Sequence, residues 1–190
     1  MNKRSQTGRL RIIGGQWRGR KLIFPAAADL RPTPDRVRET LFNWLQGIIP
    51  GARCLDLFAG SGALGLEALS RDAASVVMVE KQPHLADRIR THLQTLSATN
   101  GDVVTADVLQ FLQRPATPFD VVFLDPPYRM DCLEQCCGLL ERRGWLSDNA
   151  YIYLEAPSRA PLPPLPQNWT VLRSKVAGHV GYHLAHRTPP

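Results

Sequence analysis

The sequence predicts an α/β fold: a doubly wound, mostly parallel sheet with helices on both faces. Three observations predict it. From residue 53 onward, short apolar runs alternate with amphipathic segments, an order typical of parallel strands joined by right-handed helical crossovers. The run LDLFAGSGALGLEAL at 55–69 contains a strand, a glycine turn and a helix. The run FDVVFLDPPY at 119–128 is a second apolar strand that ends in a polar, proline-containing turn.

Length and cysteine content fit one domain with a small appendage. A chain of 190 residues buries roughly 70% of its unfolded surface and needs no disulfides. The cysteines lack the paired spacing of a zinc site, so we expect them to be reduced and expect no metal; they are Cys54, Cys132, Cys136 and Cys137. The sequence shows no signal-peptide core and no run of about 18 apolar residues. We therefore expect a cytoplasmic protein that does not enter a membrane.

Most of the positive charge lies near the N-terminus. The net charge is +6, but residues 1–31 alone account for +7, which leaves −1 for residues 32–190. The basic side chains of this segment, set against the single acid Asp29, are Lys3, Arg4, Arg9, Arg11, Arg18, Arg20, Lys21 and Arg31. Such side chains release counterions from phosphates, and Trp17 with its arginine neighbours can stack on bases. We predict nucleic acid as the partner; a solvated terminal tail is the alternative.

The first element expected along the chain is a short β-hairpin. The run LRIIGGQWRGRKLIF at 10–24 alternates around Gly14 and Gly15, a pattern typical of two paired strands. We divide the chain into a basic arm with this hairpin at 1–30 and a larger domain at 31–190.

A helix over 33–47 follows, before the alternating core at 53–190. Thr33 is expected to cap this helix, and Pro34 suits its first turn. Its buried face at helical spacing consists of Val37, Leu41, Trp44, Leu45 and Ile48. Asp35, Arg36 and Arg38 are therefore expected to point away from the buried face.

The remaining elements complete the sheet. Strands are expected near 53–58, 75–80, 102–105, 119–124 and 150–155, and helices near 62–71, 83–97, 107–113 and 130–142. A proline-rich stretch at 157–166 is expected to form a surface loop. The runs WTVLRSK and GYHLAHR that follow it predict an antiparallel hairpin. The sheet would then have seven strands with a reversed edge strand.

The glycine loop predicts a ligand site at the end of the first core strand. Gly60, Gly62 and Gly65 match the pattern G-x-G-x-x-G, which suits NAD, FAD and S-adenosylmethionine alike. Asp56 precedes this loop, where a carboxylate would repel a pyrophosphate but attract a cation. The ammonium and sulfonium of S-adenosylmethionine fit better; hydrogen bonding of Asp56 to loop amides is the alternative.

Two further acids follow the next strands. Glu80 lies 20 residues after Gly60, where an acidic side chain reaches ribose hydroxyls. Asp107 follows the third strand and is placed to accept from an adenine amino group. A salt bridge from Glu80 to Lys81 and capping of the short helix by Asp107 are the alternatives.

The Asp125-Pro126-Pro127-Tyr128 turn predicts the chemistry. It follows the strand expected beside the glycine loop, at the switch point where doubly wound folds bind ligands. The carboxylate of Asp125 and the carbonyl of Pro126 can accept both N–H groups of an exocyclic amine, which directs the nitrogen lone pair at a methyl donor. Tyr128 can stack on the base. A packed, purely structural turn is the alternative.

With these two motifs and the runs RIIGGQWRGRKL and RPTPDRVRETLFNWL, the chain resembles the RsmD family of bacterial 16S rRNA guanine-N2 methyltransferases over nearly its whole length. The resemblance implies a Rossmann-like class I methyltransferase fold with S-adenosylmethionine as donor and S-adenosylhomocysteine as product. It also implies methylation of one guanine, guanine 966 of 16S rRNA. The implied partner is this rRNA in the small ribosomal subunit or a late assembly intermediate, and we expect a monomer.

The resemblance also implies roles for individual residues. The catalytic residues would be Asp125, Pro126 and Tyr128. The cofactor site would consist of Asp56, Phe58, Gly60, Gly62, Glu80, Lys81, Asp107, Val108 and Asp125. The residues that contact RNA would be Arg11, Trp17, Arg18, Arg20, Arg31, Thr33, Arg36 and Arg38.

Other functions are compatible with parts of this pattern. The same acceptor pair could serve methylation of adenine N6 or of a glutamine amide, and substrate competition would separate these reactions. An NAD-dependent oxidoreductase is disfavoured by Asp56 and the proline turn. A non-catalytic RNA-binding module is disfavoured by the presence of every expected catalytic residue.

Overall fold

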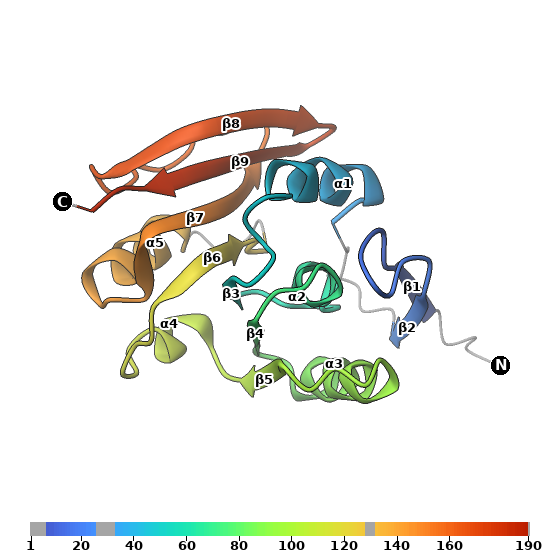
Figure 1. The fold of residues 1–190 in the computed structure, drawn as a ribbon. Coiled ribbons are helices and arrows are strands. Elements are labelled where there is room, and N and C mark those ends of the chain that lie inside the picture. The colour runs from blue at the N-terminus through green and yellow to red at the C-terminus, as the bar shows by residue number, and fades with distance from the viewer. Residues whose placement is uncertain (1–6, 26–32, 128–131, 190) are drawn as a thin grey trace, which may run out of the picture.

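The computed structural model describes residues 7–25, 33–127 and 132–189. Within them the chain forms a two-stranded sheet and a seven-stranded sheet (Figure 1). The strands are β1 Thr7–Arg11, β2 Lys21–Pro25, β3 Arg53–Asp56, β4 Ser75–Glu80, β5 Gly101–Thr105, β6 Phe119–Leu124, β7 Leu146–Pro157, β8 Trp169–Ala177 and β9 Val180–Arg187. The helices are α1 Asp35–Trp44, α2 Ala63–Ser70, α3 Pro83–Thr95, α4 Val108–Phe111 and α5 Leu133–Arg142.

The large sheet has the order β5-β4-β3-β6-β7-β9-β8. Neighbours from β5 to β7 are parallel, whereas β9 is antiparallel to both β7 and β8. The predicted fold class is confirmed, and the reversed strand is β9, one place in from the edge strand β8. The order also places β3 beside β6, so the glycine loop and the Asp125 turn follow adjacent strands.

The two faces of the sheet have separate cores. One core joins the N-terminal hairpin, α1, α2 and α3 to side chains such as Cys54 of β3 and Phe123 of β6. The other joins α4 and α5 to the alternate residues, such as Leu55 and Leu124. Alternation along each strand therefore assigns every strand residue to one face, and Figure 1 shows the helices in these two layers.

The N-terminal hairpin has its glycines in a role other than a tight turn. β1 and β2 pair from Thr7–Pro25 to Arg11–Lys21, so residues 12–20 form a long connection. A Cβ on Gly15 would collide with the carbonyl of Ser70, and Gly15 has a φ of +72°. Glycine here lets the connection approach the end of α2, where Gln16 N–H donates to Ser70 O at 2.7 Å.

Helix α1 differs from the prediction at its start and on one face. Pro34 is the N-cap residue, and no side chain caps the helix; the expected capping by Thr33 is wrong. Val37 and Leu41 are buried as expected. Arg38, expected to point away from the core, is only 1% exposed, because a neighbouring carboxylate receives its guanidinium, as described below.

Candidate active site

Four acidic side chains lie on one face of the sheet, where four neighbouring strands end. Asp56 ends β3, Glu80 ends β4, Asp125 follows β6, and Glu155 lies near the end of β7. Each is two residues beyond a side chain of the core that α1 and α2 cover, namely Cys54, Met78, Phe123 and Tyr153. Because strand residues alternate between faces, all four carboxyl groups share that covered face.

The glycine loop brings its amides to these carboxylates. Gly60 and Gly62 both have positive φ, and Gly62 is the N-cap of α2. Gly60 N–H donates to Glu80 Oε2 at 2.8 Å, and Gly65 N–H donates to Asp56 Oδ2 at 3.1 Å. A Cβ on Gly65 would lie 2.5 Å from the sulfur of Met78, so this glycine lets α2 pack closely on the sheet.

The electrostatics of this cluster favour a cationic ligand. Burial raises the pKa of Asp56 from 3.8 to about 7, and the nearby Asp125 and Glu80 add to the rise. A positively charged ligand stabilises a carboxylate that is under this repulsion, whereas the negative charge of a pyrophosphate destabilises it further. This set of carboxylates therefore fits S-adenosylmethionine, because its ammonium and sulfonium are cationic and its ribose hydroxyls can donate hydrogen bonds to the carboxylate oxygens.

Lys81 and Asp107 follow the structural alternatives considered in the sequence analysis only in part. Lys81 Nζ lies 3.1 Å from Asp107 Oδ2, which makes Asp107, and not Glu80, the observed partner of Lys81. Asp107 is also the N-cap of α4 and accepts from the Leu109 N–H at 3.0 Å. The hydrogen bond from Lys81 lowers the pKa of Asp107, so it stays ionised. Val108 begins α4 and is buried in the core that α4 and α5 cover, and Phe58 packs against that core.

Asp125 lies at the centre of the candidate site. It is half-buried, and its Oδ2 accepts a hydrogen bond of 3.1 Å from Thr33 Oγ1. Burial raises its pKa to about 6, which is near the range where a carboxylate can both accept and release a proton. Pro126 is buried beside it. Tyr128, predicted to stack on the base, lies outside the described residues.

Sequence reasoning missed the carboxyl group next to Asp125. Leu124 pairs with Leu154 in the β6–β7 register, so Asp125 and Glu155 follow at the same level. Tyr153 Oη donates to Glu155 Oε1 at 2.6 Å. The available signal was an acid ending the apolar run YIYLE, but its proximity to Asp125 depends on which strands are neighbours.

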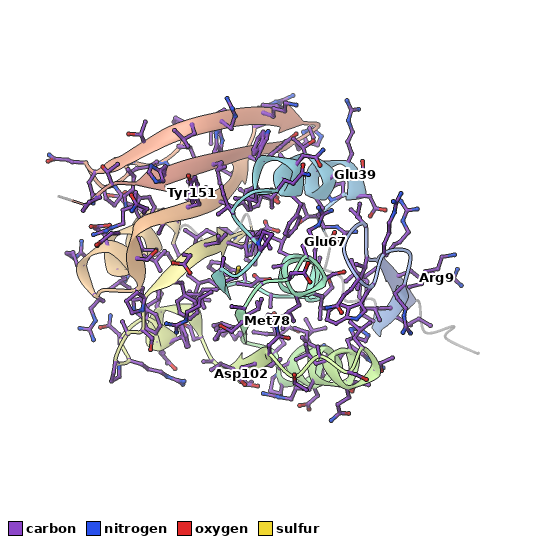
Figure 2. All side chains as sticks on the ribbon, viewed as in Figure 1. Arg9, Glu39, Glu67, Met78, Asp102 and Tyr151 are labelled. Carbon is purple, nitrogen blue, oxygen red and sulfur yellow. The ribbon has the colours of Figure 1, made fainter. Side chains whose placement is uncertain are left out.

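The predicted RNA contacts fall into an exposed group and a buried group. Arg11, Arg18, Arg20 and Arg36 are exposed, as are Arg9 and Lys21 of the same region; Figure 2 shows Arg9 on the outer side of the hairpin. Trp17 is 9% exposed and belongs to the core. Its ring therefore offers little surface for stacking on a base, contrary to the prediction. Arg31 lies outside the described residues.

Arg38 forms part of a buried network with Glu67, a second residue that sequence reasoning missed. Arg38 Nη2 donates to the Arg11 carbonyl at 2.9 Å and to Asp35 Oδ1 at 2.7 Å, and its Nη1 lies 3.5 Å from Glu67 Oε2. Glu67 also accepts from the amides of Ile13 and Gly14 at 2.9 and 2.8 Å. Figure 2 labels Glu67 on α2, near the hairpin. Arg38 is therefore a structural cation here and not an exposed RNA contact.

Two other features are absent from the part of the chain that the structure describes. No helix there is long and apolar enough to cross a membrane. Within the same residues, no group of three or more histidine, cysteine, aspartate or glutamate side chains is arranged to hold a metal ion.

Comparisons with known proteins identify the family of this chain. The family model described as "Conserved hypothetical protein 95" matches residues 10–186. The Ribosomal RNA small subunit methyltransferase D of Escherichia coli strain K12 is 52% identical over 183 residues, which cover 96% of this chain and 92% of the relative. Its counterpart in Haemophilus influenzae is 48% identical and covers 93% of each chain.

The fold agrees as well. The solved structure of the Escherichia coli protein yhhF matches with a TM-score of 0.88 at 51% identity, covering 96% of this chain and 100% of that one. The resemblance inferred from the motifs is confirmed. The chain therefore belongs to the family described as "Conserved hypothetical protein 95", the RsmD family.

Proposed function

We propose that this chain is a cytoplasmic, S-adenosylmethionine-dependent rRNA methyltransferase that methylates the exocyclic N2 of one guanine of 16S rRNA, guanine 966 by the family resemblance. The observation that carries the proposal is the position of the Asp125-Pro126-Pro127 turn, directly after β6 and beside the glycine loop that follows β3. The named relatives, which are methyltransferases of small-subunit rRNA, support the substrate class.

The residues present fit the cofactor. Glu80 has one oxygen accepting from Gly60 N–H and the other from Gln82 N–H, which holds the carboxylate in place to receive ribose hydroxyls through its remaining lone pairs. Asp56 supplies negative charge for the cationic part. When bound, S-adenosylmethionine supplies a methyl group on a positively charged sulfur, which leaves as a neutral thioether.

The amine is oriented by two acceptors. A guanine N2 amine is a weak nucleophile because its lone pair is delocalised into the ring, but it offers two N–H donors. Asp125 accepts one and the Pro126 carbonyl the other, so the lone pair points at the methyl group and transfer depends on positioning and electrostatics. Asp125 then receives the proton that the methylated nitrogen loses, since its raised pKa makes it a competent acceptor.

The RNA would contact the basic surface formed by Arg9, Arg11, Arg18, Arg20, Lys21 and Arg36. Glu67 and Ser70 of α2 fix the hairpin connection through backbone amides, so these arginines project from a rigid base. A rigid basic surface of phosphate-binding side chains suits the shape of a large folded RNA better than the sequence of a free duplex. The substrate is therefore the assembled small subunit or a late intermediate, which the monomer approaches through this surface.

The experiment that tests the proposal is transfer of tritium from methyl-labelled S-adenosylmethionine. Unmodified small subunits, naked 16S rRNA, duplex DNA and protein extract are offered in parallel, followed by nucleoside analysis. We expect label in N2-methylguanosine, chiefly from subunits. Label in N6-methyladenine or in glutamine would retain the cofactor assignment and reject the substrate. Cofactor binding without transfer to any of the four substrates would reject the assignment of the chain as a methyltransferase.

The role of Asp125 is tested separately. Asp125→Ala should abolish transfer and leave the affinity for S-adenosylhomocysteine, measured by calorimetry, within a few-fold of the parent. Loss of cofactor binding together with transfer would contradict the assignment of Asp125 to the amine.

A further inference from the structure

We propose that Glu155 is a positioning residue for Asp125: it keeps a proton that it donates to Asp125, and thereby holds Asp125 ionised and aimed at the exocyclic amine. The catalytic part of this inference rests on the proposed function, whereas the shared proton is a property of the protein alone.

The geometry places the two carboxyl groups side by side. Their strands are parallel neighbours, with Leu124 paired to Leu154 just before them. Glu155 is 3% exposed and lies close enough to Asp125 for the two carboxyl groups to interact directly. Two carboxylates in contact in a buried position repel each other strongly, so a hydrogen bond between them requires one of them to carry a proton.

The surroundings assign that proton to Glu155. Burial raises the pKa of Glu155 to about 9, and the neighbouring Asp125 contributes to the rise. Burial also raises the pKa of Asp125, but only to about 6, because hydrogen bonds from Thr33 and Glu155 lower it. Between these values the pair holds a single proton. Asp125 is the ionised member.

Among the described residues, the titratable groups that interact with the pair are acids and phenols. Asp56 of the neighbouring strand β3 lies near Asp125 on the same face of the sheet, and Glu80 of β4 lies on the other side of Asp56. Tyr153 of β7 donates to Glu155 at 2.6 Å, and its own pKa is raised well above 10 by burial, with Tyr182 of β9 nearby. The raised pKa keeps the phenol of Tyr153 neutral where Glu155 titrates. Among the described groups that interact with the pair, the proton between Asp125 and Glu155 is therefore what relieves their repulsion.

The shared proton has a defined place in the reaction. As the C–N bond forms from the nitrogen lone pair, the S–CH3 electron pair returns to sulfur, and the amine nitrogen becomes positively charged. Asp125 takes one proton from that nitrogen and becomes a neutral acid, while Glu155 keeps its own proton. Release of the Asp125 proton to solvent returns the pair to its starting state. Loss of the Glu155 proton at alkaline pH would remove the hydrogen bond that orients Asp125.

The first arm of the test is a titration of the ligand-free protein. Glutamate side-chain carboxyl groups are labelled with ¹³C, and the Glu155 signal is assigned as the one missing from Glu155→Gln. We expect this signal to move only at alkaline pH, several pH units above the exposed glutamates. Titration of Glu155 together with the exposed glutamates would overturn the inference whatever the substrate is.

The second arm compares variants in methyl transfer to small subunits. Glu155→Gln keeps a neutral donor, so transfer at pH 7 should stay within about threefold of the parent, whereas Glu155→Leu should lose at least tenfold in kcat with a smaller effect on KM. The parent is expected to lose methyl transfer at alkaline pH, and Glu155→Gln should shift or abolish this loss. Tyr153→Phe should move that decline to higher pH, because the Tyr153 hydrogen bond lowers the pKa of Glu155.

A matched control separates this role from general packing. Glu141 of α5 accepts from Trp169 Nε1 at 2.8 Å and from Arg187 Nε at 2.9 Å, in the core on the other face of the sheet. Glu141→Gln should leave the pH profile of transfer unchanged. Equal losses in Glu155→Gln and Glu155→Leu at pH 7, with both proteins folded, would overturn the positioning role. If no variant or parent methylates subunits, the proposed function fails and the titration still decides the shared proton.

Discussion

The hydroxyl of Thr33 donates a 3.1 Å hydrogen bond to Oδ2 of Asp125. The two residues are 92 positions apart, yet this bond joins the segment before α1 to the turn after β6. Thr33 is 6% exposed, so water does not readily replace it. Thr33 is thus part of the candidate active site through Asp125, the carboxylate that we propose accepts the amine.

Thr33→Val tests this relationship with little change in side-chain volume. A hydrogen bond to a charged group contributes about 1.5 kcal/mol or more, so kcat/KM should fall about tenfold. The bond lowers the pKa of Asp125, so its loss should move the acidic limb of the pH profile of kcat/KM to higher pH. Thr40→Val is the control, because Thr40 donates to the Arg36 carbonyl on an exposed part of α1. Equal effects of the two substitutions would contradict the assignment.

Glu67→Gln should destabilise the protein. Glu67 is fully buried and accepts from two backbone amides of the hairpin and from Arg71 Nε at 2.8 Å. An amide in its place offers one acceptor oxygen and leaves the cations of Arg38 and Arg71 less compensated, at a cost of about 3 kcal/mol. Chemical denaturation measures the loss. The exposed Glu39→Gln on α1 should stay within about 0.5 kcal/mol; a similar result for Glu67→Gln would refute this role.

Asp56→Asn should weaken the pH dependence of stability. In the folded protein burial raises the pKa of Asp56 to about 7 from 3.8, so between these values the folded state binds a proton that the unfolded state has lost. Stability therefore falls as pH rises through this window. Between pH 5 and 8 the parent should lose about 2 kcal/mol more than Asp56→Asn, measured by urea denaturation without cofactor. Parallel curves for the two proteins would show that Asp56 has an ordinary pKa.

The double variant Arg18→Ala/Arg20→Ala should weaken binding to small subunits without changing cofactor affinity. Both side chains are exposed on the connection of the hairpin. If each neutralises a phosphate, the slope of log affinity against log salt should fall by roughly one for each. Filter binding across salt concentrations measures this slope. Arg173→Ala/Lys175→Ala on the exposed edge strand β8 is the control, and an equal loss there would show that the hairpin surface is not specific.

The local motifs could be read from the sequence because each depends on neighbouring residues. The alternation of apolar runs and helices predicts the parallel sheet. The glycines of the loop permit positive φ, and the prolines after Asp125 restrict φ, wherever they occur, so their turns were recognisable in isolation. The same holds for the acids Asp56 and Glu80, which end their strands at readable positions.

Side chains whose surroundings come from distant segments could not be read in this way. Arg38 and Trp17 are residue types that RNA-binding surfaces often contain, yet both are buried. Arg38 lies against Glu67, and the Trp17 N–H donates to the hydroxyl of Ser70 at the end of α2. The sequence allowed Asp107 either to bind a ligand or to cap a helix, and only the structure shows that it caps α4 and pairs with Lys81.

The sequence by itself thus determined the fold class, the glycine loop and the proline turn after Asp125, because the backbone preferences of glycine and proline and hydrophobic periodicity are local properties. Only the tertiary structure decided which carboxyl groups meet. The order β4-β3-β6-β7 brings Glu80, Asp56, Asp125 and Glu155 to one edge on one face. Burial then raises the pKa values of Asp56, Asp125 and Glu155, and repulsion from neighbouring carboxylates adds to the rise for Asp56 and Glu155. These interactions depend on distances that no single segment contains.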